Sequence, residues 1–178
     1  DVLVRVMTTA VNIGDARLRA LRVPRGLSIP TRLAMGILRP RNPVLGLEVA
    51  GIVEQVGAGV RSFKPGDRVV ASRGFKFGGH AEFMAVPETG SIAGIPAGVS
   101  DADAVALLFG GVTALIFFDK GKLQAGEHVL VNGASGAVGV MAVQIAKQRG
   151  AEVTGVCSAA NADLVRSLGA GLRDRSAR

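Results

Sequence analysis

The chain of 178 residues carries a formal net charge of +7, and 48% of its residues are hydrophobic while 20% are charged. This composition excludes an intrinsically disordered chain and is typical of a packed globular protein. The lysines and arginines form no dense block, and aromatic residues make up only 4%, with no Trp and no Tyr. Because nucleic-acid binders usually combine a basic stripe with stacking side chains, we predict no nucleic-acid partner.

The single cysteine and the longest apolar run bear on the compartment and on membrane contact. Cys157 alone cannot form an internal disulfide or a cysteine-rich zinc site, which fits a reducing, cytoplasmic location. No signal-peptide pattern opens the chain. The apolar run at residues 104–118 is shorter than the roughly 18 residues that span a membrane, so we predict a buried helix there and no membrane partner.

The first part of the chain has the pattern of a β-rich domain. Short β-branched runs separated by Gly and Pro predict strands at residues 2–6, 49–56 and 67–71. Several such strands would close into a small barrel or sandwich. The basic stretch at residues 17–41 predicts a loop-rich excursion with a short helix, and residues 90–100 have the composition of a linker.

The second part alternates helix and strand patterns. Ser100 and Asp103 have the spacing of a capping box, which predicts a helix from Ser100 to about Lys120. The pattern continues with a strand at 128–132, a helix ending at 147, a strand at 153–157 and a helix at 161–168. This alternation predicts the opening of a parallel α/β sheet.

A glycine-rich turn, GASGAVG from Gly133, stands between the strand at 128–132 and the helix that follows it. Such a turn brings backbone N–H groups and the positive end of a helix to one point, which suits a phosphate. Gly133 would allow the tight turn, Gly136 the close approach of a pyrophosphate, and Gly139 the packing of helix on strand. The alternative is a turn with a structural role only.

We therefore predict a dinucleotide site at this turn. The residues predicted to hold the pyrophosphate are Gly133, Ala134, Ser135, Gly136, Ala137, Val138 and Gly139. The next strand ends at Cys157, where NAD-binding proteins carry an acid for the ribose, but Ser158 follows here. The missing acid leaves room for a 2′-phosphate, so we predict NADP(H) as the cofactor, with Ser158 and Asn161 at the adenosine ribose. Arg166 is either a further phosphate contact or part of a solvated helix face.

Five stretches together resemble a known family. They are AVNIGDARL from Ala10, VLGLEVAGIVEQVGAGVRSFKPGDRVVA from Val44, HAEFMAVPE from His80, FGGVTAL from Phe109 and LVNGASGAVGVMAVQIAKQRGAEVTGVCS from Leu130. In this order they resemble the zinc-independent quinone oxidoreductase (zeta-crystallin-like) branch of the medium-chain dehydrogenase/reductase superfamily. The resemblance implies a GroES-like catalytic domain at residues 1–98 and the first part of a Rossmann domain at 99–178. It also implies hydride transfer to a quinone or an α,β-unsaturated carbonyl compound, and a homodimer in the full-length form.

The resemblance implies that no metal takes part. Asn12 stands where the zinc-dependent branch has a Cys, and Leu47 stands where that branch has a His. Asn is a poor zinc ligand and Leu is none. The only histidines, His80 and His128, do not complete a metal site.

Two residues are implied to lie beside the nicotinamide, namely Asn12 and Thr113, as the catalytic hydrogen-bonding groups. The alternative for Asn12 is a turn residue with a local bond involving Asp15. The alternative for Thr113 is a hydroxyl bonded back to its own helical turn. Glu48 is expected only to support the loop beside it.

The end of the chain departs from the family pattern. After Ala170 the family has an acid and a short apolar strand, whereas this chain reads GLRDRSAR. We therefore expect a fragment of the enzyme, with a shifted reading frame as one hypothesis for its end. The alternative function is a truncated, non-catalytic paralogue that binds a nucleotide or a homologous partner.

Overall fold

The computed structural model describes residues 1–20, 22, 26–36 and 42–174. The chain divides into two compact units, Asp1–Ala106 and Leu107–Arg178, which are treated separately below. The division falls inside a long helix, α3 (Asp101–Gly121), whereas the sequence analysis put the domain boundary at residue 98. The position of the boundary stays a prediction.

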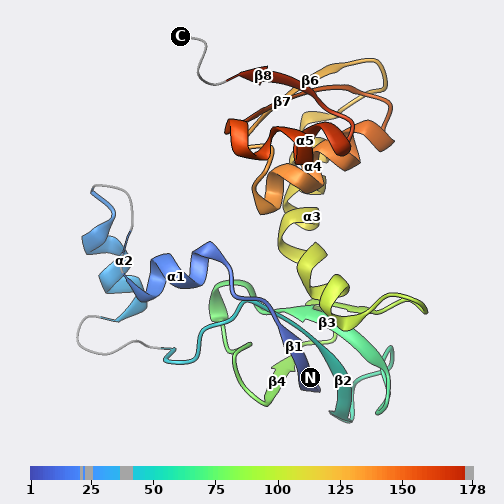
Figure 1. Cartoon of the computed structure of the whole chain (residues 1–178). Coiled ribbons are helices and arrows are strands. Elements are labelled where there is room, and N and C mark those ends of the chain that lie inside the picture. Colours follow the sequence, from blue (N-terminus) through green and yellow to red (C-terminus); the bar gives the residue numbers. More distant parts are fainter. Residues whose placement is uncertain (21, 23–25, 37–41, 175–178) are drawn as a thin grey trace. The chain divides into compact units, whose positions relative to one another are not determined.

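The first unit is built on one antiparallel sheet with the strand order β4-β1-β2-β3-β5 (Figure 1). Its strands are β1 (Val2–Thr9), β2 (Glu48–Val56), β3 (Arg68–Ser72), β4 (Phe83–Val86) and β5 (Ser91–Gly94). The helices α1 (Ile13–Arg19) and α2 (Ser28–Met35) and the 3-10 turn η1 (Gly74–Lys76) lie in the connections. Alternate side chains of the strands form the core, namely Val2, Val4, Val49, Val53, Val69, Ala71, Met84 and Val86.

The prediction of a linker at residues 90–100 is wrong for residues 91–94. Residues Ser91–Gly94 form β5, which pairs antiparallel with β3 from Val69↔Gly94 to Ser72↔Ser91. The half-buried Ile92 packs against the core of the sheet. A strand therefore forms here because β3 offers an open edge and a place for one apolar side chain, although the segment is short and rich in small residues.

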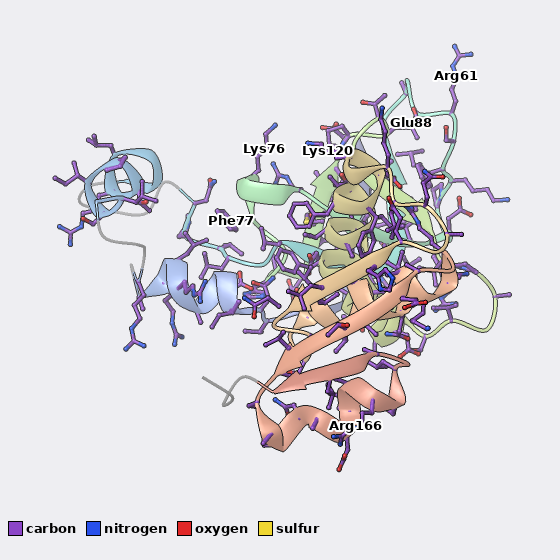
Figure 2. The ribbon with its side chains drawn as sticks, turned by 90° about the horizontal axis from the view of Figure 1, so that it is seen from above. Arg61, Lys76, Phe77, Glu88, Lys120 and Arg166 are labelled. Carbon is purple, nitrogen blue, oxygen red and sulfur yellow. The ribbon has the colours of Figure 1, made fainter. Side chains whose placement is uncertain are left out.

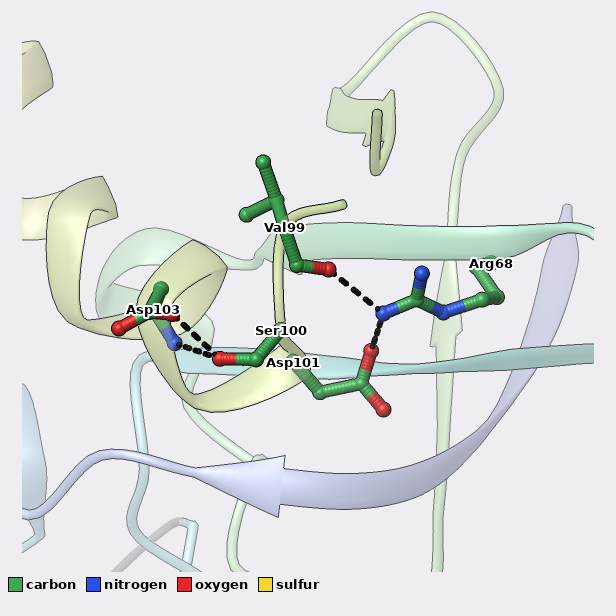
Figure 3. Close-up of polar contacts among 5 residues, drawn as sticks. All are labelled: Arg68, Val99, Ser100, Asp101 and Asp103. Carbon is green, nitrogen blue, oxygen red and sulfur yellow. Dashed lines mark hydrogen bonds and ion pairs between the residues drawn. The ribbon is translucent and has the colours of Figure 1, made fainter. Parts of the chain in front are cut away.

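The start of α3 confirms the predicted helix and its cap (Figure 3). The backbone N–H of Asp103 donates to Ser100 Oγ at 3.1 Å, and the Ser100 hydroxyl donates to Asp103 Oδ2 at 2.6 Å. Arg68 of β3 donates to the Val99 carbonyl at 3.0 Å and forms an ion pair with Asp101. These contacts fix the first turn of α3 to the sheet of the first unit.

The second unit contains a parallel sheet with the strand order β6-β7-β8. Its elements are β6 (His128–Asn132), α4 (Ala137–Gln148), β7 (Glu152–Cys157), the 3-10 turn η2 (Ala159–Asn161), α5 (Ala162–Ser167) and β8 (Gly171–Asp174). The core gathers apolar side chains of the strands and helices around the fully buried Val143 and Val165. The predicted strand and helix alternation is therefore confirmed.

β8 is a strand that the sequence did not predict, at the point where the chain departs from the family pattern. Residues Gly171–Asp174 pair parallel with β7, and Leu172 lies opposite Gly155 and packs against the core. Strand pairing uses backbone N–H and C=O groups, so a segment with a single core side chain still extends the sheet.

Helix α3 has 21 residues and is long and apolar enough to cross a membrane by length and composition alone. It is thus longer than the apolar run at residues 104–118 on which the expectation of no membrane contact was based. Only 17% of its most apolar window is buried within the described structure, so the buried helix expected from the sequence is not confirmed, although core helices of soluble proteins pass the same test of length and composition. The absence of a membrane partner stays a prediction.

Two adjacent glycines of α3 provide a matched test of its packing on α4. A Cβ added at Gly110 would lie 2.2 Å from the Ala137 carbonyl oxygen, whereas a Cβ at Gly111 meets nothing within 4 Å. We expect Gly110→Ala to destabilise the second unit by about 2 kcal/mol or more, because the two helix backbones must separate. Gly111→Ala is expected to stabilise the helix by about 0.5–1 kcal/mol. Thermal unfolding of both variants checks this, and equal shifts would contradict the close packing at Gly110.

Candidate functional site

The glycine-rich turn connects β6 to α4 and is tied to the neighbouring strand. The N–H groups of Gly133 and Ala134 both donate to the Val156 carbonyl of β7, at 2.9 and 3.0 Å. Gly133 has φ +80°, a conformation that favours glycine. The Gly136 N–H donates to the Gly133 carbonyl at 3.0 Å, which closes the turn directly before the helix.

The end of α4 that faces this turn has no side-chain cap. Gly136 is the N-cap residue and offers no side-chain acceptor to the first-turn N–H groups, which include those of Val138 and Gly139. Ala134 is fully buried beneath the turn, and Val138 packs against the core. These residues would therefore contact a ligand through their backbone. The arrangement is a cradle of N–H donors that suits an anionic group.

Three predicted polar residues of the second unit lie together at the edge of this turn. Asn161 Nδ2 donates to Ser135 Oγ and to Ser158 Oγ, at 3.2 Å in each case. Ser135 comes from the turn, and Ser158 follows the last residue of β7. Arg166 does not join them: it pairs with Asp163 at 2.9 Å on an exposed face of α5 (Figure 2). Its solvated-face interpretation is the one that fits.

Thr113 lies in the second unit, half-buried on α3. Its hydroxyl makes no hydrogen bond to any residue within the described ranges, so the back-bond to its own helical turn does not form. The hydroxyl is therefore available to a ligand. Its catalytic role stays a prediction.

Asn12, in the first unit, caps helix α1. Its side-chain Oδ1 accepts from the N–H groups of Gly14 and Asp15, at 2.8 and 3.2 Å. Asp15 Oδ2 in turn accepts from the Asn12 N–H at 3.0 Å. The local bond proposed as the alternative for Asn12 is thus present, but it occupies only the oxygen of the side-chain amide.

The nitrogen of the same amide is left without a partner. Asn12 Nδ2 is buried and donates to no acceptor within the part of the chain that the structure describes. A buried donor without a partner costs about 1–3 kcal/mol. Because the capping contacts fix the oxygen, they also fix the direction of the N–H groups. Asn12 therefore presents an N–H donor of fixed direction, from which a carbonyl oxygen could accept a hydrogen bond.

Two acidic side chains are buried in this part of the first unit. Asp15, 2% exposed, accepts through Oδ1 from the Gly46 N–H at 3.1 Å, so one carboxylate holds both the Asn12 and the Gly46 backbone. Glu48 is 4% exposed. Burial, and after it the charge of Asp15, raises the pKa of Glu48 from 4.5 to about 7. The charge of Glu48 is thus coupled to that of Asp15, which the sequence did not reveal, while the support role of Glu48 stays a prediction.

Each of the two histidines has a partner other than a metal ligand set. The His80 ring Nε2 lies 3.2 Å from the Ala10 carbonyl oxygen, and His128 pairs with Glu152 at 3.2 Å on an exposed strand end. Among the described residues, no group of three His, Cys, Asp or Glu could hold a metal ion. The independence from zinc stays a prediction that rests on Asn12 and Leu47.

The raised pKa of Glu48 predicts a pH dependence of stability. The pKa of Glu48 in the folded chain lies above its value in the unfolded chain. Its contribution to the free energy of unfolding is therefore complete below pH 4.5 and is lost as the pH rises through 7. At about 1.4 kcal/mol per pKa unit, the complete loss is about 3–4 kcal/mol. We expect Glu48→Gln to remove it and to be more stable than the wild type at pH 8.

Urea unfolding at pH 5 and pH 8, followed by the NMR signals of Val49 and Val53, measures this difference. Glu82→Gln, at an exposed position, is the matched control. A Glu48→Gln variant with the pH dependence of the control would show that Glu48 titrates normally in the folded chain.

The chain is similar to known oxidoreductases over most of its length. The family model for the alcohol dehydrogenase GroES-like domain matches residues 1–97, more than half of the chain. A chloroplastic quinone-oxidoreductase homolog of Spinacia oleracea is 39% identical over 153 residues. The chain belongs to the quinone oxidoreductase branch of the medium-chain dehydrogenase/reductase superfamily. The family resemblance and the fold class predicted from the sequence are confirmed.

Other members of the superfamily cover nearly the whole chain. The mitochondrial NAD(P)H oxidoreductase RTN4IP1 of Homo sapiens is 34% identical over 178 residues and 96% of this chain. The structure of Escherichia coli quinone oxidoreductase complexed with NADPH covers 99% of this chain with a TM-score of 0.79 and 28% identity.

The chain spans about half the length of these relatives. The alignment with the Spinacia oleracea protein includes 80% of this chain but only 46% of that protein. The corresponding shares are 45% of the human protein and 51% of the Escherichia coli chain. The activity, substrates and partners of the whole protein are therefore matters for a proposal.

Proposed function

We propose that this member of the quinone oxidoreductase branch binds NADP(H) at the glycine-rich turn and belongs to a zinc-independent oxidoreductase that reduces a quinone or an α,β-unsaturated carbonyl compound. The observation that carries the proposal is the uncapped end of α4 beside the glycine-rich turn, where the first-turn N–H groups have no side-chain acceptor. The relatives support it, since one is named an NAD(P)H oxidoreductase and another was solved with NADPH.

The residues present fit this cofactor. The turn can hold a pyrophosphate through the first-turn N–H groups of α4 at residues 137–139, since Gly133 and Gly136 carry no side chain in the way. No carboxylate follows β7 among Cys157, Ser158, Ala159 and Ala160, so nothing there repels a 2′-phosphate. When bound, the reduced nicotinamide supplies the hydride.

The side chains of the chain would orient the substrate. In the proposal the Asn12 amide donates a hydrogen bond to the substrate carbonyl oxygen and stabilises the negative charge that develops there. Its direction is fixed by the α1 cap and by Asp15. For the second unit we propose Thr113 as a hydrogen-bond donor on its own evidence, since its hydroxyl has no partner among the described residues. The cytoplasmic location and a homodimer of the full-length form belong to the same proposal and rest on the single cysteine and on the family.

A second candidate is a nucleotide-binding module without turnover, since the uncapped end of α4 needs no catalytic group to hold a nucleotide. NADPH oxidation by the purified chain, followed by absorbance with a quinone and then an enone, distinguishes the two. The enzyme proposal expects consumption above the protein-free rate, which falls on Asn12→Ala. NADPH binding without consumption would favour the module, and an absence of binding would contradict both.

A further inference from the structure

Asn161 connects two hydroxyl groups that come from different segments of the second unit. Its side-chain nitrogen donates to Ser135 Oγ in the glycine-rich turn and to Ser158 Oγ after β7, each at 3.2 Å. The backbone N–H of Asn161 also donates to the Ser158 carbonyl at 2.9 Å, which keeps the amide beside Ser158. The two hydrogens of the amide nitrogen are thus both used.

These contacts determine which way the serine hydroxyls can act. A hydroxyl has one proton to donate and two lone pairs to accept with. Because Asn161 donates to both oxygens, each hydroxyl keeps its own proton. Neither Ser135 Oγ nor Ser158 Oγ donates to an acceptor among the described residues. Both protons are therefore available to an acceptor outside the chain.

The positions of the two hydroxyls correspond to two different phosphates of one ligand. Ser135 lies in the turn before α4, where a pyrophosphate would bind. Ser158 follows the second strand of the parallel sheet, where doubly wound folds contact the adenosine ribose.

We propose that Asn161 is a positioning residue that turns the Ser135 and Ser158 hydroxyls into donors for the pyrophosphate and the 2′-phosphate, and so sets a preference for NADP(H) over NAD(H). This inference rests on the proposed function, since it needs a dinucleotide at the turn. It differs from a direct phosphate contact, because Asn161 acts through the serines.

An acid at this position would reverse the arrangement. The carboxylate of Asn161→Asp would accept from both hydroxyls, withdraw their protons from the ligand and repel a 2′-phosphate. A carboxylate after the second strand is also the group that binds the ribose hydroxyl of NAD. We expect NADPH to bind about 10–100-fold more weakly, because charge-assisted hydrogen bonds are worth about 1.5–3 kcal/mol. NADH is expected to change by less than about 3-fold on the same scale.

The test is a set of fluorescence titrations with NADPH and NADH, reported as the ratio of the two Kd values. The variants are Asn161→Asp, Asn161→Ala, Ser158→Ala, the double variant Asn161→Ala/Ser158→Ala, and the control Gln144→Glu. The control makes the same change from amide to acid on an exposed position of α4. Asn161 is itself exposed, so circular dichroism should show all variants folded.

The double variant separates positioning from direct contact. If Asn161 acts through Ser158, the NADPH preference lost on Ser158→Ala is not lost further on adding Asn161→Ala. Additive losses, or unchanged preferences in Asn161→Asp and Asn161→Ala, would overturn the inference while NADPH binding by the wild type upholds the proposed function. A wild-type chain that binds neither cofactor would overturn both.

Discussion

Replacing Gly139 with alanine is expected to weaken NADPH binding by this chain strongly and to destabilise its second unit. A Cβ at Gly139 would lie 2.2 Å from the Gly133 carbonyl oxygen and 2.7 Å from the Ala134 Cα. Both atoms belong to the backbone of the turn, so α4 must move away from it. We expect the Kd to rise by at least about 100-fold and the unfolding free energy to fall by about 2–3 kcal/mol.

Gly136→Ala is the matched variant that separates binding from folding. Its Cβ would lie 3.4 Å from the Gly133 oxygen, an ordinary contact, and Gly136 has φ −82°, which alanine adopts freely. We expect this variant to keep its thermal stability but to bind NADPH more weakly, because a methyl group then stands where the pyrophosphate approaches. If Gly139→Ala binds NADPH like the wild type, the turn is not the cofactor site.

The second large effect is expected at Asp15 in the first unit. Asp15→Ala leaves the backbone N–H groups of Asn12 and Gly46 without the carboxylate that accepts from both. The side chain is 2% exposed, so water does not readily replace it. We expect a loss of about 3–4 kcal/mol in the free energy of unfolding of this unit. Part of the loss is offset at high pH, because removing the Asp15 charge lowers the pKa of Glu48.

Hydrogen exchange measured on peptides of β1 and β2 reports this loss, and peptides of β6 and β7 from the same sample serve as the internal control. The expected result is faster exchange in the first unit alone. Unchanged exchange in β1 and β2 would show that Asp15 does not hold the loops together.

The elements predicted from the sequence are those fixed by local patterns. The strands at residues 128–132 and 153–157 follow from runs of β-branched residues. The helix that begins after Ser100 follows from the capping pair Ser100 and Asp103, three positions apart. β5 was missed because its four residues carry one partly buried apolar side chain, and its pairing with β3 joins segments far apart in the chain. β8 was missed because it carries one apolar core side chain, Leu172, and is joined to the sheet by backbone pairing with β7, which leaves no pattern in the sequence.

The candidate site was predicted as residue types but not as contacts. The turn at Gly133 follows from glycine spacing, whereas the contact of Asn161 with Ser135 spans 26 residues and depends on the sheet order. Asn12 was identified through the family, but its partnerless Nδ2 follows only from the occupied Oδ1. The coupling of Glu48 to Asp15 likewise depends on burial, which no spacing of two acids reveals.

The most direct test of the account is the NMR spectrum of the ¹⁵N-labelled chain during a titration with NADPH. The account predicts saturable shifts of the backbone amides of residues 133–140, with further shifts at Ser158 and Asn161, and little change in the strands of the first unit. An absence of shifts in these residues at millimolar NADPH, or shifts confined to other segments, would contradict a dinucleotide site at the glycine-rich turn.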